Sequence, residues 1–284
     1  MSDQLIVTVL TENGPACRGG LSCEHGLSLH LVHGRLQLLL DFGQSDAFAK
    51  NADAMGVDLT LVDAAVLSHA HYDHADGMGA FFARNDRAPL HLSAACGETC
   101  WSTKGGTAAA HYIGIAPGLL ARFADRLSPA PTDRVTTIAP DVHLVPHTTP
   151  DLTEVGRAAG MLLHEDDTWR PDDFAHELTL VVELRRGAEA PLAVFNSCSH
   201  AGLPTIVSEV REAFPDRRIA AYVGGLHLVH ACGEEIARVA AAVKAAGIDA
   251  LYTGHCTGTH ALELLDHTLP GHVHALHPGL AFVL

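Results

Sequence analysis

The first third of the chain carries short apolar segments separated by polar residues, a pattern typical of β-strands. Three segments predict early strands, the first of them alternating only weakly: Leu5–Leu10, Leu27–Val32 and Leu36–Leu40. His33-Gly34-Arg35 joins the second to the third, and its glycine suits a tight hairpin turn. Ser45–Met55 has helical spacing instead, and the apolar run Ala64–Leu67 predicts a short buried strand.

Strand and helix patterns alternate more regularly in the last third. Predicted helices and strands are interleaved there in the order Pro204–Phe214, Ile219–Val223, Glu234–Ala246, Ala250–Tyr252, Ala261–Leu265 and Ala281–Leu284. Before them, Leu178–Leu184 and Leu192–Phe195 predict a hairpin. Residues 96–135 predict an irregular excursion with one helix near Leu119–Leu127. The whole pattern predicts mixed α/β sheets with helices outside, in a single domain over residues 1–284.

Composition and charge narrow the class of protein. The 284 residues are 48% hydrophobic and 18% charged, as in an ordinary soluble globular protein. No apolar run approaches the roughly 20 residues of a membrane span, and the N-terminus lacks the basic region of a secretory signal, so we expect a cytoplasmic protein. The formal charge of −15 and the lack of a basic patch disfavour nucleic acid as a partner. Seven cysteines, an odd number, suit free thiols in a reducing compartment.

The densest chemistry lies in His69-Ala70-His71-Tyr72-Asp73-His74, directly after the predicted strand Ala64–Leu67. Four potential metal ligands fall within six residues, which packing alone does not explain. On a strand, His69 and His71 would point to the same face, because side chains alternate with a period of two. Imidazoles and a carboxylate at this spacing suit a zinc or iron site, with one ion or two.

Three more histidines follow predicted strands in the same way. They are His200 after Leu192–Phe195, His227 after Ile219–Val223 and His255 after Ala250–Tyr252. Functional groups of α/β proteins gather at strand ends. Four strand ends that each carry a histidine beside small residues therefore predict one shared site.

The motif His69-x-His71-x-Asp73-His74 resembles the signature of the metallo-β-lactamase fold superfamily. Other segments resemble the branch of 7,8-dihydropterin-6-yl-methyl-4-(β-D-ribofuranosyl)aminobenzene 5′-phosphate synthase-like proteins: Glu24-His25-Gly26-Leu27-Ser28, Leu67-Ser68-His69, Ser197-Cys198-Ser199-His200-Ala201-Gly202, Gly224-Gly225-Leu226-His227-Leu228 and Gly254-His255-Cys256-Thr257-Gly258. The similarity runs from about Leu5 to His260 and is weakest between Cys96 and Glu177.

The resemblance implies a four-layer αββα sandwich of two mixed sheets, with metal at one edge. It implies that His69 and His71 bind one ion, and we expect His200 to complete its ligands. A second ion would be bound by Asp73, His74 and His255. Zinc is the expected metal, with one or two ions, although imidazole and carboxylate ligands also accept iron or manganese.

The chain departs from the better-known hydrolases of the superfamily at one ligand. They place a bridging Asp after the strand that corresponds to Leu192–Phe195, where this chain offers Cys198, Ser199 and His200. His200 is our first choice for the ligand that completes the first ion, and Cys198 is the alternative. By the same resemblance, Asp41 would fix the imidazole of a ligand from outside the metal sphere.

Two further histidines are candidates for contact with the substrate. His227 and His25 could each bind substrate or shuttle a proton near neutral pH. Asp73, while ligating, could orient the attacking water or accept its proton. His111 and Tyr112 lie in the irregular region, which we expect to shape the substrate pocket.

The sequence therefore predicts a metal-dependent hydrolase, or a related addition–elimination enzyme, that acts on a small molecule through a metal-activated water. An ester, a lactone, a thioester, an amide or a small phosphorylated pterin-like compound would fit. A di-iron oxidoreductase is the second hypothesis, because the same ligand types hold iron. A binding or sensor protein that keeps the site without turnover is the third. The sequence does not indicate an oligomeric state.

Overall fold

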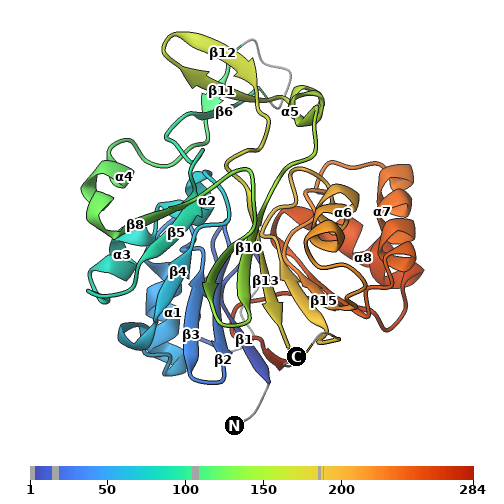
Figure 1. Ribbon diagram of the computed structural model, residues 1–284, viewed down its shortest axis with the longest axis horizontal. Coiled ribbons are helices and arrows are strands. Elements are labelled where there is room, and N and C mark those ends of the chain that lie inside the picture. The colour runs from blue at the N-terminus through green and yellow to red at the C-terminus, as the bar shows by residue number, and fades with distance from the viewer. Residues whose placement is uncertain (1–3, 15–18, 104–108, 185–186, 188) are drawn as a thin grey trace.

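The computed structural model describes residues 4–14, 19–103, 109–184, 187 and 189–284. Two seven-stranded sheets stack face to face, with helices on both outer sides (Figure 1). This is the αββα sandwich that the resemblance implied. Among the described residues, no helix combines the length and the apolar character that a membrane span requires.

The first sheet has the strand order β18-β1-β2-β3-β4-β5-β8. Its strands are β1 Leu5–Thr11, β2 Ser28–His33, β3 Leu36–Leu40, β4 Ala64–Val66, β5 Leu90–Ser93, β8 Leu127–Ala130 and β18 Ala281–Val283. Pairing is antiparallel from β18 to β3 and parallel from β3 to β8. The hairpin between β2 and β3 turns through Gly34, whose φ of +64° lies in the left-handed region that glycine adopts most readily. The predicted turn is thus confirmed.

The second sheet has the strand order β17-β16-β15-β14-β13-β10-β9. Its strands are β9 Thr136–Ala139, β10 Val142–Pro146, β13 Leu178–Glu183, β14 Leu192–Phe195, β15 Ile219–Val223, β16 Ala250–Thr253 and β17 Val273–Ala275. Pairing is antiparallel from β9 to β14 and parallel from β14 to β17. The parallel half brings the ends of β14, β15 and β16 to one edge, which is where their histidines follow.

The helices cover the outer faces. Beside the first sheet lie α1 Ala47–Met55, α2 Tyr72–Ala75, α3 Met78–Phe82, α4 Leu119–Arg122 and the 3₁₀ turns Leu59–Leu61 and Ala124–Arg126. Beside the second lie α6 Leu203–Ala213, α7 Gly233–Ala245 and α8 Thr259–Thr268, while the 3₁₀ turn His255–Thr257 follows the end of β16. A further helix, α5 Leu152–Ala159, lies above the sandwich (Figure 1).

Alternation along the central strands divides the core into three layers. In β3, Leu38 and Leu40 belong to the apolar cluster between the sheets, while Leu39 belongs to the cluster that includes Phe48 of α1. In β14, Phe195 faces the first sheet and Val194 packs in the cluster under α6 and α7. Both sheets are therefore buried on both faces, which explains their nearly continuous apolar runs.

A third, four-stranded sheet lies above one end of the sandwich (Figure 1). It has the order β12-β11-β6-β7 and consists of β6 Cys100–Ser102, β7 His111–Tyr112, β11 Met161–Glu165 and β12 Thr168–Pro171. We call it the upper sheet. The sequence predicted only an irregular excursion for much of this region, because strands this short carry too few residues to display a period. The helix predicted near Leu119–Leu127 ends early at Arg122, and Leu127 begins β8.

Candidate metal centre

His69 and His71 do not lie on a strand, so that part of the prediction is wrong, whereas Asp73 and His74 do follow where the chain turns. β4 ends at Val66, His69 lies in a bend, and α2 begins at Tyr72. His71 forms an isolated bridge with Gly114. The chain turns sharply here, yet the ring centroids of His69 and His71 are only 4.6 Å apart. The bend, rather than strand alternation, brings the ligand side chains together.

The first group of candidate ligands consists of His69, His71 and His200, which we call the histidine set. One nitrogen from each ring lies within 4.8 Å of the others. The rings are buried, yet Nε2 of His69, Nε2 of His71 and both nitrogens of His200 have no hydrogen-bond partner among the described residues. Buried polar atoms are normally paired. Three such rings around one point fit a metal ion, which would accept their lone pairs.

The protonation of the histidine set suits the same ligand. Burial, reinforced by the neighbouring His176, lowers the pKa of His71 to about 3. Burial and nearby histidines also hold the pKa of His69 and His200 well below the usual value. The three imidazoles are therefore neutral near pH 7, which is the form that binds metal.

The second group consists of Asp73, His74 and His255, which we call the aspartate set. His74 Nε2 lies 3.1 Å from His255 Nε2 and 3.5 Å from Asp73 Oδ2, and His255 Nε2 lies 3.3 Å from the same oxygen. Ligand atoms about 2.0–2.1 Å from a tetrahedral ion lie roughly 3.3 Å apart. The triangle thus has the size of one face of a zinc coordination sphere.

Charge favours a cation at the aspartate set. Burial opposes protonation of His74, yet Asp73 and Asp41 raise its pKa to about 10. Burial likewise opposes ionisation of Asp73, but His74 and His255 hold its pKa well below the usual value. A positive charge is therefore stabilised among these side chains, whether it is a proton or a metal ion.

Asp41 and Ser68 orient ligands from both sets. Asp41 accepts hydrogen bonds from Ser68 N at 2.7 Å, from Ser68 Oγ at 2.7 Å and from His74 Nδ1 at 2.8 Å. Because the Ser68 hydroxyl donates to Asp41, its oxygen accepts from His69 Nδ1 at 2.8 Å. Nε2 of both imidazoles is then left as the metal-binding nitrogen. The sequence marked Ser68 only as part of the segment Leu67-Ser68-His69 and predicted no role for it.

Glu12 and Asn13, at the end of β1, are also functional candidates that the sequence analysis missed. The Glu12 carboxylate accepts the backbone N–H of His255. Asn13 Oδ1 accepts from His255 Nδ1 at 2.8 Å, and Asn13 Nδ2 donates to His25 Nδ1 at 3.1 Å. His25 can then donate from Nε2 to Asp73 Oδ2, which lies 3.2 Å away. One amide side chain therefore orders two histidines of the site.

The segment that carries His200 is held by a buried ion network. The Glu177 carboxylate accepts the backbone N–H groups of His200 and Ala201, at 3.0 and 3.2 Å. His147 lies between Glu177 and Glu209, with its two ring nitrogens 2.7 Å from their oxygens. The network fixes the loop after β14 from behind, and Phe174 stacks on the His200 ring at 5.3 Å.

Several site residues have strained backbones. Asp41, Ser199, His227 and His255 have φ values between +52° and +60°, in the left-handed region that non-glycine residues rarely adopt. Strain of this kind persists only where surrounding contacts enforce it, and it concentrates at functional sites. Gly224, with φ of +138°, lies where a Cβ would collide with the Asn196 carbonyl. A glycine is required there for β15 to end so close to β14.

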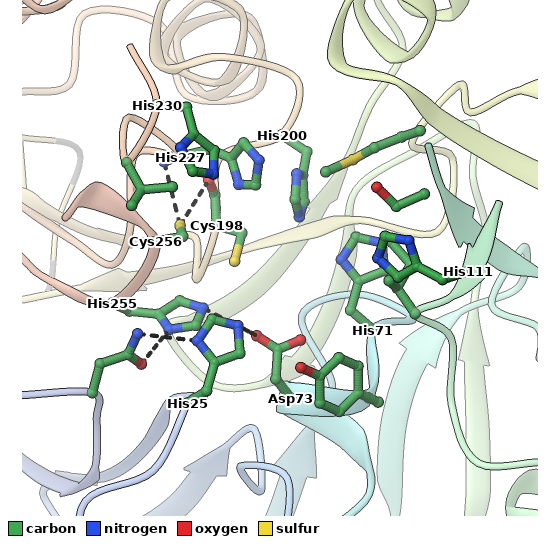
Figure 2. A pocket seen from close by; sticks show the side chains of 16 residues that line it. His25, His71, Asp73, His111, Cys198, His200, His227, His230, His255 and Cys256 are labelled. Atoms are coloured by element: carbon green, nitrogen blue, oxygen red, sulfur yellow. Dashed lines mark hydrogen bonds and ion pairs between the residues drawn. The ribbon is translucent and has the colours of Figure 1, made fainter. Parts of the chain in front are cut away.

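A pocket of about 410 Å³ opens onto both ligand sets (Figure 2). His71 and His200 of the histidine set, Asp73 and His255 of the aspartate set, and Cys198 line it. Three walls surround these residues: Asn13, His25 and Tyr72; His227, Val229 and His230; and Ser102, His111, Ile113 and Met161 from the upper sheet and the loop after it. His111 therefore lies in the pocket wall, and His227 faces His200 with ring centroids 4.5 Å apart.

Comparisons with known proteins agree with this architecture. No protein-family model matches the chain. The crystal structure of Tm1679, a metal-dependent hydrolase of the β-lactamase superfamily, is 27% identical and covers 98% of both chains with a TM-score of 0.78. The metallo-β-lactamase fold protein YhfI from Bacillus subtilis is 14% identical and covers all of both chains with a TM-score of 0.61. The second likeness shows the fold alone.

One curated relative is similar over part of its length. It is the 7,8-dihydropterin-6-methyl-4-(β-D-ribofuranosyl)-aminobenzene-5′-phosphate synthase of Methanocaldococcus jannaschii, 29% identical over 108 residues. The matched segment is 38% of this chain and 35% of that protein. The fold, the neighbours and the candidate metal groups together support a metal-dependent enzyme. The chain therefore has the metallo-β-lactamase fold.

Proposed function

We propose that the chain is a metal-dependent hydrolase, or a related addition–elimination enzyme, for a small molecule. The observation that carries the proposal is the pair of ligand sets at the floor of one pocket. The histidine set would hold one ion and the aspartate set a second, with zinc the expected metal. When bound, the metal would lower the pKa of a coordinated water and polarise a carbonyl or phosphoryl oxygen.

The residues around the floor have separate roles in this proposal. Asp73 presents its carboxylate to the pocket, where it would orient the attacking water and take its proton. His25 donates from Nε2 to the same carboxylate and would hold it in position at the mouth of the pocket, where the His25 side chain is 52% exposed. His227, on the opposite wall, would bind the substrate or protonate the leaving group.

Size and lining favour a small substrate. The pocket volume of about 410 Å³ falls in the range of small-molecule sites. Met161 and Ile113 offer an apolar surface, while Ser102 and His111 beside them offer polar groups. An ester, a lactone, a thioester, an amide or a phosphorylated pterin-like compound would be accommodated. The name of the curated relative supports the last of these.

The test combines metal analysis with a substrate panel. We expect the purified chain to contain zinc and to hydrolyse at least one of these classes, and His71→Ala to lose the ion of the histidine set and activity together. His267→Ala, an exposed histidine of α8, is the matched control and should keep both. Full activity in a His71→Ala variant that lacks the ion of the histidine set would contradict the proposal. Iron with visible absorption in the wild-type chain would favour the di-iron oxidoreductase instead.

A further inference from the structure

Cys198 lies between the two ligand sets and belongs to neither of them. Its sulfur is 3.3 Å from His74 Nε2. It falls in one group with His69 and His74, and in another with His255 and Cys256, in each of which the ligand atoms lie within 4.8 Å of one another. The side chain is buried and faces the pocket. The sulfur thus lies within 4.8 Å of one member of the histidine set, His69, and of two members of the aspartate set, His74 and His255.

The charge of the site calls for an anion at this point. Five of the six side chains in the two sets are imidazoles, and Asp73 is the one carboxylate among them. Two divalent ions held by these side chains would repel each other strongly inside a protein, where charges are poorly screened. A shared anionic ligand lowers that repulsion, and a cysteine sulfur binds metal as the thiolate.

The backbone around Cys198 is fixed before any ligand binds. Ser199 N donates to Asn196 Oδ1 at 2.6 Å, and Ser199 Oγ contacts Tyr222 Oη at 2.8 Å and the Gly225 carbonyl at 2.6 Å. Glu177 holds the next two backbone N–H groups. The sulfur therefore occupies a preset position, which a metal ligand requires.

The neighbouring Cys256 differs in its contacts. Its sulfur accepts the backbone N–H of His227 at 3.3 Å and lies 3.7 Å from the Cys198 carbonyl. It also fills the space that a side chain at Gly225 would need. These contacts hold the loops after β15 and β16 together, so Cys256 is a matched control for a buried thiol beside the site.

We propose that Cys198 provides a thiolate that bridges the two metal ions, in place of the bridging carboxylate that the loop after β14 lacks. The inference rests on the metal centre of the proposed function. Binding displaces the thiol proton, which is released to solvent. A sulfur ligand also favours zinc, cobalt or iron over magnesium or manganese.

Cobalt substitution tests the bridge without reference to activity. Metal-free chain is titrated with Co²⁺, and the near-ultraviolet sulfur-to-cobalt charge-transfer band is followed against bound metal. We expect the band in the wild-type chain and in Cys256→Ser, with two equivalents bound. Cys198→Ser should lose the band and weaken the second equivalent. Cys198→Asp should lose the band yet keep both equivalents, because it restores a carboxylate bridge.

The outcomes separate the bridge from the proposed function. Two bound cobalt ions without the band, or a band that survives in Cys198→Ser, would overturn the bridge and leave the metal centre intact. If the band is lost in Cys256→Ser but kept in Cys198→Asp, the sulfur ligand is Cys256, and the proposed Cys198 bridge is overturned. A wild-type chain that binds no cobalt or zinc would overturn both. Circular dichroism of each variant verifies that it is folded.

Discussion

The two ligand sets lie at the floor of one pocket but are built differently. The histidine set, formed by His69, His71 and His200, is neutral, and four of its ring nitrogens have no partner among the described residues. In the aspartate set, Asp73 carries the negative charge, and Asp41, Asn13 and Glu12 hold its members. The difference indicates unequal affinity: we expect the aspartate set to bind the tighter ion and the histidine set the weaker one.

The largest effect is expected from Asp73→Asn, which removes the charge of the aspartate set and the acceptor for the water proton. We predict loss of the tighter metal equivalent and a fall in kcat of roughly 10²–10⁴-fold, the range for general acid–base groups. The measurement is metal content together with steady-state rates. If Asp73→Asn keeps both metal equivalents and the full rate, the aspartate set does not bind the tighter ion, and the proposed difference between the two sets is wrong.

The buried ion network of Glu177, His147 and Glu209 should contribute strongly to the free energy of unfolding. Replacing His147 with Gln leaves the buried carboxylates of Glu177 and Glu209 without their shared partner. Breaking a buried ion network by removing one member typically costs about 3–5 kcal/mol. We therefore predict a loss of this size in the free energy of unfolding, measured in urea, while His267→Gln on the surface changes little.

The same network predicts a pH dependence. Burial alone would lower the pKa of His147, but its hydrogen bonds to Glu177 and Glu209 raise it from 6.5 to about 9. A folded-state pKa above the unfolded one stabilises the protein fully below the unfolded value, and that stability is lost as the pH rises through the folded value. The wild-type chain should lose this contribution between about pH 6.5 and pH 9. His147→Gln should not show it, and an equal slope in both proteins would contradict the assignment.

Asp41→Asn should act on metal affinity more moderately. Groups that orient metal ligands from outside the coordination sphere typically contribute 10–100-fold to affinity, and we predict a loss of about that size. Its direct bond is to His74 and its link to His69 runs through Ser68, so the tighter equivalent should suffer more. Competition with a chromophoric chelator would measure the dissociation constants of both metal equivalents. An equal loss of affinity at the two equivalents would argue against two sets of unequal affinity.

The smallest effect is expected from Asn13→Asp. A carboxylate still accepts from His255 Nδ1 but cannot donate to His25 Nδ1. We predict nearly unchanged metal affinity and a rate reduced by about 10-fold or less, because only the orientation of His25 is lost, whereas loss of a general acid–base group typically costs about 10²–10⁴-fold. Asn13→Ala, which loses both bonds, should weaken metal binding as well. If Asn13→Asp and Asn13→Ala show the same rate and the same metal affinity, the hydrogen bond from Asn13 Nδ2 to His25 has no role of its own.

Regions with a clear hydrophobic period, or with closely spaced ligands, could be predicted from the sequence. The strands of the sandwich were found because long apolar runs mark strands buried on both faces, as in β3 and β14. The upper sheet was missed because β6 and β7 are too short to show a period. The structure gathers His69, His200 and His255 from three segments at one edge, although the strand expected for His69 and His71 is a bend.

The supporting contacts could not be found in the same way. Ser68, Asn13 and Glu177 act through hydrogen bonds to residues far along the chain, as when Glu177 holds the backbone of His200. A single Ser, Asn or Glu has no local pattern that announces such a partner. The sequence therefore supplies the candidate ligands, while their tautomers and the unequal charge of the two sets follow only from the fold.

The most direct test of this account is the number and strength of bound metal ions in three proteins. Metal-free wild-type chain, His71→Ala and Asp73→Asn are titrated with Zn²⁺ by calorimetry, and the bound metal is counted by mass spectrometry. We predict two unequal equivalents in the wild-type chain, loss of the weaker one in His71→Ala and loss of the tighter one in Asp73→Asn. A wild-type chain that binds no zinc, or variants that keep both equivalents, would contradict it.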